Sequence, residues 1–257
     1  MHSIFGPKHL IILAISVAAL IAVYLVMRRM TLVSVCRMVL YCGIVSEIIK
    51  IFYYIIRNEE THGGVLPKSD LPFHLCSIQI LLIVIVTTVN SEKIKRMVLS
   101  FMMPSCMCGG VAAILIATSS SLNGMLILTF QYFGYHVLIS AFGIYLLTSK
   151  EFGVTYKDYF SCLKFLLIVM FFAFYINSIV YDGVSNVNYM YVVSPPQSGL
   201  PFLNEEHGWL VYIVHYAFLV ITCLTLCYIK PIIKALRSRI SKKSVVSDTE
   251  EKVHETV

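Results

Sequence analysis

The stretch LPFHLCSIQ, residues 71–79, carries three side chains that could do chemistry: His74, Cys76 and Gln79. Pro72 suits the first turn of a helix, because its missing N–H would have no partner there. We therefore expect a helix that begins near Pro72 and brings an imidazole, a thiol and an amide together within about one and a half turns. A neighbouring base can convert a thiol into a nucleophilic thiolate, so His74 and Cys76 are candidate catalytic residues.

The composition decides what kind of element positions these side chains. The chain has 257 residues, of which 58% are hydrophobic and 13% charged, and its mean hydropathy is +0.81. That charged fraction is about half of what a soluble domain carries. Several apolar runs reach the ~20 residues that a helix needs to cross a bilayer. We expect an all-α, polytopic membrane protein.

Seven hydrophobic spans are expected, which would form a seven-transmembrane-helix bundle within residues 1–230. The spans cover residues 8–27, 31–56, 71–89, 97–118, 125–147, 160–181 and 208–229. The remainder, residues 231–257, is basic and then of mixed charge, and we expect it to be a disordered cytoplasmic tail.

The Lys and Arg residues are unevenly divided between the two sides of these spans. One side holds Arg28, Arg29, Lys93, Lys95, Arg96, Lys150, Lys157, Lys164 and the seven Lys and Arg residues from Lys230 onwards, and the other holds Lys8, Arg57 and Lys68. By the positive-inside rule, the N-terminus is outside and the C-terminus is cytoplasmic. This distribution, rather than nucleic-acid binding, accounts for the net charge of +6. The absence of an Asn-x-Ser/Thr sequon favours a bacterial plasma membrane.

With this topology, polar side chains from five spans fall in the outer half of the bilayer. They are Glu47, Lys50, His74, Cys76, Gln79, Gln131, His136, Asn177 and His215. An ionisable residue within a span costs ~2.5–3.5 kcal/mol on insertion scales, so it normally faces the bundle interior. Convergence at one depth predicts a single polar pocket, with Asn188 and Tyr189 in the outer loop beside it.

Each of these residues also has a structural interpretation. Glu47 and Lys50, at i and i+3, can neutralise one another. His215 can form a hydrogen bond between helices, and Cys76 can be a packing residue. Three histidines and a thiol could hold zinc, but the chain has neither a His-x3-His nor a Cys-x2-Cys pair. We expect no metal and no other cofactor.

The chain resembles the YwaF-type bacterial seven-helix integral membrane protein family, whose animal relatives are the transmembrane protein 164 acyltransferases. The resemblance is carried by these segments: FGPKHL at 5–10, LPFHLCS at 71–77, YFGYH at 132–136, GIYLL at 143–147, NVNYMY at 186–191, and Pro195-Pro196. In the animal relatives a cysteine directly precedes the histidine of the third span. Phe73 occupies that position here, and Cys76 lies three residues further on, which is one helical turn.

The resemblance implies lipid acyl transfer. His74 or His136 would be the general base for Cys76, which would take an acyl chain from a phospholipid as a thioester. The acceptor would be a lyso-lipid or a lipoprotein amine. Gln79, Asn188 and Tyr189 would position the head group or stabilise an oxyanion.

The same pocket fits a second class of function, a small-molecule transporter or receptor, with Glu47, Lys50, Gln131, Asn177 and His215 among its binding residues. A scaffold subunit without chemistry of its own is a third hypothesis. Membrane phospholipids are the expected partners and nucleic acid is not; the sequence specifies no oligomeric state.

Overall fold

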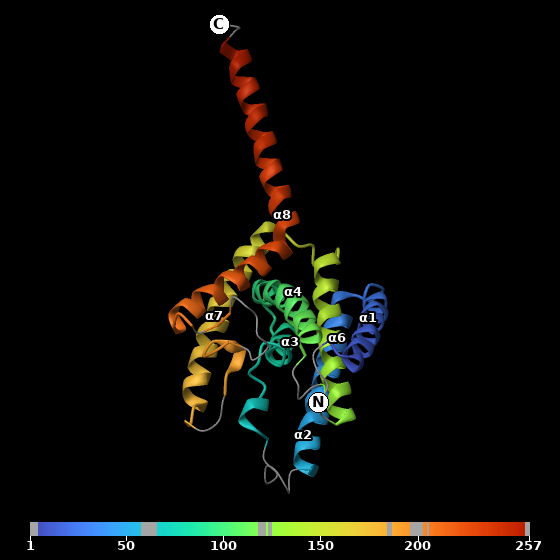
Figure 1. Ribbon diagram of the computed structural model, residues 1–257. Coiled ribbons are helices and arrows are strands. Elements are labelled where there is room, and N and C mark those ends of the chain that lie inside the picture. The colour runs from blue at the N-terminus through green and yellow to red at the C-terminus, as the bar shows by residue number, and fades with distance from the viewer. Residues whose placement is uncertain are drawn as a thin grey trace.

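The protein is an all-helical bundle (Figure 1). The structure is a computed structural model that describes residues 5–57, 66–117, 122, 125–183, 187–195, 203–204 and 206–254, and only the backbone of residues 239–254. Parts of the loops expected at 57–70, 119–124 and 182–207, Asn186 and Pro196 among them, lie outside this range, as do residues 255–257.

Seven α-helices and no strand occur among the described residues. The helices are α1 (Pro7–Met27), α2 (Leu32–Arg57), α3 (Ile78–Thr88), α4 (Glu92–Leu115), α6 (Leu126–Thr148), α7 (Tyr156–Val180) and α8 (Trp209–His254). All except α3 are long and apolar enough to cross a membrane. The expectation of a multi-pass helical membrane protein is confirmed.

Helix α3 differs from the third span that the sequence predicted. Its 11 residues would cover only about 16 Å at 1.5 Å per residue. The chain before it forms a short 3₁₀-helix, η1 (Lys68–Asp70), followed by turns over residues 71–77. The prediction that a helix begins near Pro72 is therefore wrong. The Gln79 side chain and the Tyr135 hydroxyl bind carbonyls of this turn, as described for the candidate site.

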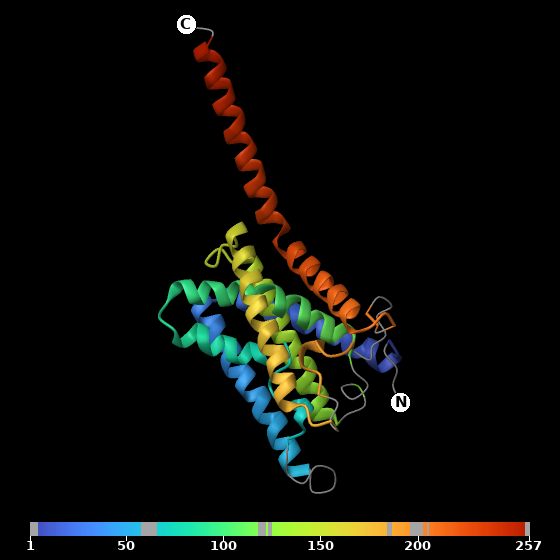
Figure 2. The same cartoon turned by 90° about the vertical axis from the view of Figure 1, so that its left-hand side faces the viewer.

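Helix α8 continues through Pro231 to His254 and extends well beyond the bundle (Figure 2). The structure thus describes residues 231–254 as helix, where the sequence led us to expect a disordered tail.

Helix α4 lies at the centre of the bundle and packs against α3, α6, α7 and α8. Its contact with α6 is close because small residues face each other there. A Cβ atom added at Gly143 would lie 2.5 Å from the backbone nitrogen of Met107, and one at Gly110 would lie 2.3 Å from the Ser140 hydroxyl oxygen. These two glycines allow α4 and α6 to hold their side chains in a fixed register.

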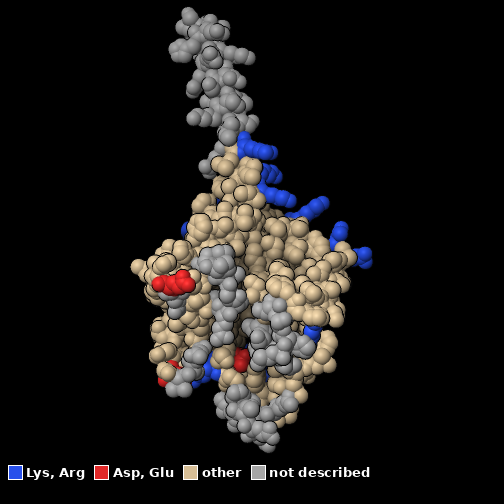
Figure 3. Space-filling view, in the orientation of Figure 1, with Lys and Arg blue, Asp and Glu red and all other residues tan. Residues whose placement is uncertain are grey.

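Cross-links between helices define two ends of the bundle. At one end, the Tyr24 hydroxyl lies 3.1 Å from Thr148 Oγ1, and Arg96 pairs with Asp158. At the other end, His9 Nε2 lies 3.0 Å from the carbonyl oxygen of Ile114. Figure 3 shows Lys and Arg side chains gathered at the first of these ends, where α8 leaves the bundle.

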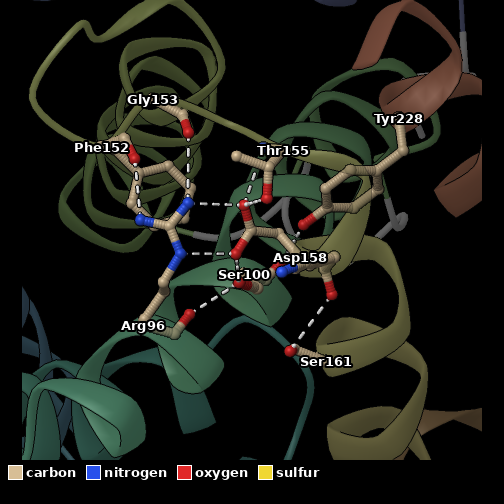
Figure 4. Close-up of polar contacts among 9 residues, drawn as sticks. Arg96, Ser100, Phe152, Gly153, Thr155, Asp158, Ser161 and Tyr228 are labelled. Carbon is tan, nitrogen blue, oxygen red and sulfur yellow. Dashed lines mark hydrogen bonds and ion pairs between the residues drawn. The ribbon is translucent and has the colours of Figure 1, made fainter. Parts of the chain in front are cut away.

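A buried carboxylate joins α4, α7 and α8 at the basic end (Figure 4). Asp158 is 2% exposed and accepts two hydrogen bonds of 2.7 Å from the Arg96 guanidinium. It also accepts from Thr155, at the start of α7, and from Ser100. The Tyr228 hydroxyl donates to the Ser100 carbonyl at 2.7 Å, which adds α8 to the cluster. The charge of Asp158 is therefore compensated by a fixed set of donors from its surroundings.

We predict that Asp158→Asn lowers the free energy of unfolding by about 2–4 kcal/mol, because Arg96 keeps its charge and loses its carboxylate. The measurement is unfolding of the purified protein in mixed micelles. Glu92→Gln is the matched control: Glu92 pairs with Lys95 but its side chain is 84% exposed, so little change is expected. Equal losses in both variants would contradict a special role for the buried carboxylate.

Candidate functional site

The candidate site is built on the non-helical segment 71–77 that leads into α3. Exposed carbonyls of such a segment are tolerated inside a membrane bundle only where protein groups bind them. The side-chain amide of Gln79 donates to the Leu75 carbonyl at 2.9 Å, and the Tyr135 hydroxyl donates to the Cys76 carbonyl at 2.8 Å. These two donors stabilise the turn that carries Cys76.

Gln79 also ties this segment to the central helix α4. Its amide nitrogen donates to Ser105 Oγ at 3.1 Å, and the Cys106 thiol donates to its amide oxygen at 3.2 Å. Gln79 is 1% exposed, and both of its amide hydrogens are used. This side chain therefore positions the turn and has no N–H left for a ligand.

The thiol of Cys76 lies beside the imidazole of His136 on α6, near enough for the two groups to interact electrostatically. His136 is 4% exposed, and its Nδ1 lies 2.7 Å from the Tyr132 carbonyl oxygen. A carbonyl can only accept, so Nδ1 carries the hydrogen and Nε2 is left as the basic nitrogen. This arrangement assigns the tautomer that a general base for a cysteine requires.

His74, the other candidate base, is held elsewhere. Its Nε2 lies 3.1 Å from the Ser69 carbonyl oxygen, and its ring packs edge-on against Tyr189 with centroids 5.2 Å apart. Phe73 packs between Phe172 and Tyr189, at 5.9 and 5.4 Å. The structure thus brings His136 rather than His74 to the Cys76 thiol.

A short loop covers this aromatic cluster. It contains the 3₁₀-helix η2 (Tyr189–Tyr191), and Tyr189 is fully buried. Asn177 on α7 binds the backbone of Tyr189 twice, at 3.0 and 2.9 Å. The Tyr189 hydroxyl donates to the Lys68 carbonyl. Asn188 organises the loop itself, since its amide donates to the Ser194 carbonyl at 2.7 Å.

Side chains of α8 hold this loop in a strained conformation. Met190 and Tyr191 have φ values of 55° and 53°, in the left-handed region that non-glycine residues rarely adopt. The Tyr216 hydroxyl donates to the Met190 carbonyl at 2.9 Å, and Tyr212 donates to the Tyr191 carbonyl. Such strain persists only where surrounding groups enforce it, which is common at functional sites.

Within the ranges that the structure describes, the remaining predicted side chains form no hydrogen bond with Cys76 or His136. Glu47 and Lys50 form an ion pair of 2.8 Å, and Lys50 also donates to the Asp70 carbonyl. Gln131 donates to Ser46 on α2 at 2.8 Å. His215 is exposed on α8, with no hydrogen bond to any described residue. Among the described residues, no three His, Cys, Asp or Glu side chains come together as metal ligands.

Four residues of the site were not identified from the sequence: Tyr132, Tyr135, Ser105 and Cys106. Tyr132 and His136 stand at i and i+4 of a predicted helix, so their contact was available from periodicity. Cys106 and Ser105 lie in a span that starts at the opposite side, and residue depth alone did not associate them with Gln79.

Comparison with known proteins places the chain in a family. A sequence model described as the TMEM164 family matches residues 4–228, which include every candidate residue discussed above. No curated protein matches the chain, and no solved structure does.

We predict that Tyr135→Phe lowers the free energy of unfolding by about 1–3 kcal/mol, because the Cys76 carbonyl loses its shorter hydrogen bond and keeps only the one of 3.3 Å from the Gln79 backbone N–H. It should also change the rate at which Cys76 reacts with a small alkylating reagent, measured by peptide mass spectrometry. Tyr41→Phe, at an exposed tyrosine of α2, is the control and should alter neither quantity. An unchanged Cys76 rate in Tyr135→Phe would count against the hydroxyl as the support of this turn.

Proposed function

The chain belongs to the TMEM164 family, and from this premise we propose that it is a membrane-bound lipid acyltransferase with Cys76 as nucleophile and His136 as general base. Membership confirms the family resemblance noted in the sequence. The observation that carries the proposal is the juxtaposition of the Cys76 thiol, in the turn before α3, and the buried His136 imidazole on α6. The tautomer fixed by Tyr132 supports the same assignment.

In the first half-reaction, His136 Nε2 takes the thiol proton and the Cys76 sulfur attacks the ester carbonyl of a phospholipid. The carbon–sulfur bond forms as the ester carbon–oxygen bond breaks. The leaving alkoxide of the lyso-lipid takes the proton from His136. The products are a thioester on Cys76 and a lyso-phospholipid.

The second half-reaction reverses these roles. The hydroxyl of an acceptor lyso-lipid gives its proton to His136 and attacks the thioester, and the thiolate leaves and recovers the proton. The acyl chain has then moved from one lipid to another without any redox partner. An amine of a lipoprotein could replace the hydroxyl with the same proton balance.

Ser77 is the residue we assign to the developing oxyanion. Its hydroxyl oxygen lies 4.0 Å from the Cys76 sulfur, and its backbone N–H directly follows Cys76 in the chain. Gln79, Asn188 and Tyr189 were the donors expected from the sequence, but each uses its hydrogens within the fold. We assign them to positioning of the turn and its covering loop.

Both substrates of this reaction are membrane lipids, which suits a site within a helical bundle. The distribution of Lys and Arg supports an orientation with the N-terminus outside and the C-terminus cytoplasmic. We propose that the Cys76–His136 pair lies in the outer half of a bacterial plasma membrane, the orientation resting on this charge distribution and the bacterial source on the absence of an Asn-x-Ser/Thr sequon.

The central test measures transfer of a labelled acyl chain from a phospholipid to a lyso-phospholipid by the purified protein in vesicles. We expect Cys76→Ala and His136→Ala to lower the rate at least about a hundredfold, since the pair acts as a unit. His74→Ala should lower the transfer rate by a smaller factor, because its imidazole does not contact the thiol. Full activity in Cys76→Ala would exclude the thioester route.

Two further observations sharpen this test. Labelled acyl groups should accumulate on Cys76 when the acceptor is left out, and neutral hydroxylamine should release them. Cys42→Ala is the matched cysteine control, since Cys42 is exposed on α2 and should keep normal transfer. A binding protein or transporter would show neither transfer nor a labelled cysteine.

Orientation is tested with cysteines placed at the two ends of the bundle. Intact cells carrying Val193→Cys, in the covering loop, should react with a membrane-impermeant maleimide. Cells carrying Lys150→Cys, at the basic end, should react only after the membrane is opened. The reverse pattern would invert the proposed topology.

A further inference from the structure

A groove of about 1050 Å³ lies at the basic end of the bundle, apart from the Cys76–His136 pair. It lies among the ends of α6 and α7, the middle of α4, and α8 on either side of Pro231. Its walls are mostly apolar, with Leu147, Val154 and Leu226 among them. On α4, Cys106 contacts Gln79 in the candidate site, whereas Cys108 lines the groove.

The rim of this groove carries an uncompensated positive charge. Lys157, Lys230 and Lys234 belong to its lining, and all three are exposed. None of the described lining residues is acidic. The ion pairs found in the described part of the chain involve other cations, namely Lys50, Lys68, Lys95 and Arg96. Figure 3 shows Lys and Arg side chains near the base of α8.

We propose that this groove binds a membrane phospholipid with an anionic head group. The head group would lie among Lys157, Lys230 and Lys234, and an acyl chain would lie against the apolar wall. Charge complementarity favours this occupant, because three cations meet beside an apolar surface without a carboxylate partner. The volume is at the upper end of the ~300–1,000 Å³ range of ligand sites, so it suits an elongated ligand.

The position of the rim agrees with the way lipids contact membrane proteins. Basic side chains next to the end of a membrane helix attract anionic head groups, each strengthening binding about fivefold. Lys230 and Lys234 stand at i and i+4 around Pro231, so they lie on one face of α8. Lys157 approaches from the first turn of α7. The three cations thus come from two helices that meet at this groove.

The test titrates the purified full-length protein, in a neutral detergent, with phosphatidylglycerol or with phosphatidylcholine of the same acyl chains. Bound lipid is counted by native mass spectrometry. We expect phosphatidylglycerol to bind at least about tenfold more tightly. The triple variant Lys157→Ala, Lys230→Ala, Lys234→Ala should remove this preference. The matched control replaces Lys93, Lys150 and Lys164, all exposed and outside the groove, and should keep it.

Cysteines in the groove provide an independent readout. Cys223 lines the groove, so phosphatidylglycerol should slow its alkylation in the unmodified protein but not in the groove variant. Equal loss of binding in both triple variants would overturn the proposal in favour of general attraction to a basic surface. Protection of Cys223 that depends on protein concentration without lipid would overturn it in favour of a second copy.

Discussion

The site depends on one constraint: a non-helical backbone placed inside an apolar bundle must have its carbonyls bound by protein donors. Gln79 and Tyr135 supply those donors for Leu75 and Cys76. The Cys76 carbonyl also accepts from the Gln79 backbone N–H at 3.3 Å, whereas a regular helix would bind both carbonyls through its own backbone and would orient Cys76 by helical periodicity. The turn instead places the thiol against His136, on a different helix.

The central helix α4 connects this turn to the rest of the bundle through side-chain contacts. Through Ser105 and Cys106 it fixes Gln79, and through Arg96 it fixes the start of α7. Its close contact with α6, made possible by Gly110 and Gly143, sets the height of His136 relative to the turn. The Cys76–His136 pair therefore has supporting contacts on both the turn and α6, as precise positioning of the proposed nucleophile and base would require.

The sequence predicted the helical membrane class and the six long helices of the described residues. An uninterrupted apolar run of ~20 residues matches the length that a helix needs to cross a bilayer. Depth along a span also follows from the sequence, which is how His136 was associated with Cys76. The side of the helix on which a residue lies is harder to predict from the sequence when the helix is hydrophobic on all sides. His215 shared the predicted depth but faces outward. The turn at 71–77 was missed because its donors, Tyr135 and Gln79, act on backbone groups that no spacing rule identifies.

The same turn bears on the replacement of the cysteine expected before His74. If residues 71–77 were helical, positions 73 and 76 would share a face and Cys76 could substitute simply by a shift of one turn. The backbone is not helical there, and Phe73 packs with Phe172 and Tyr189. Cys76 reaches an imidazole because Tyr135 and Gln79 shape the turn, not because of helical spacing. Under the proposed function, the position of the nucleophile is then a property of this turn and its donors, and a thiol at position 73 is not needed.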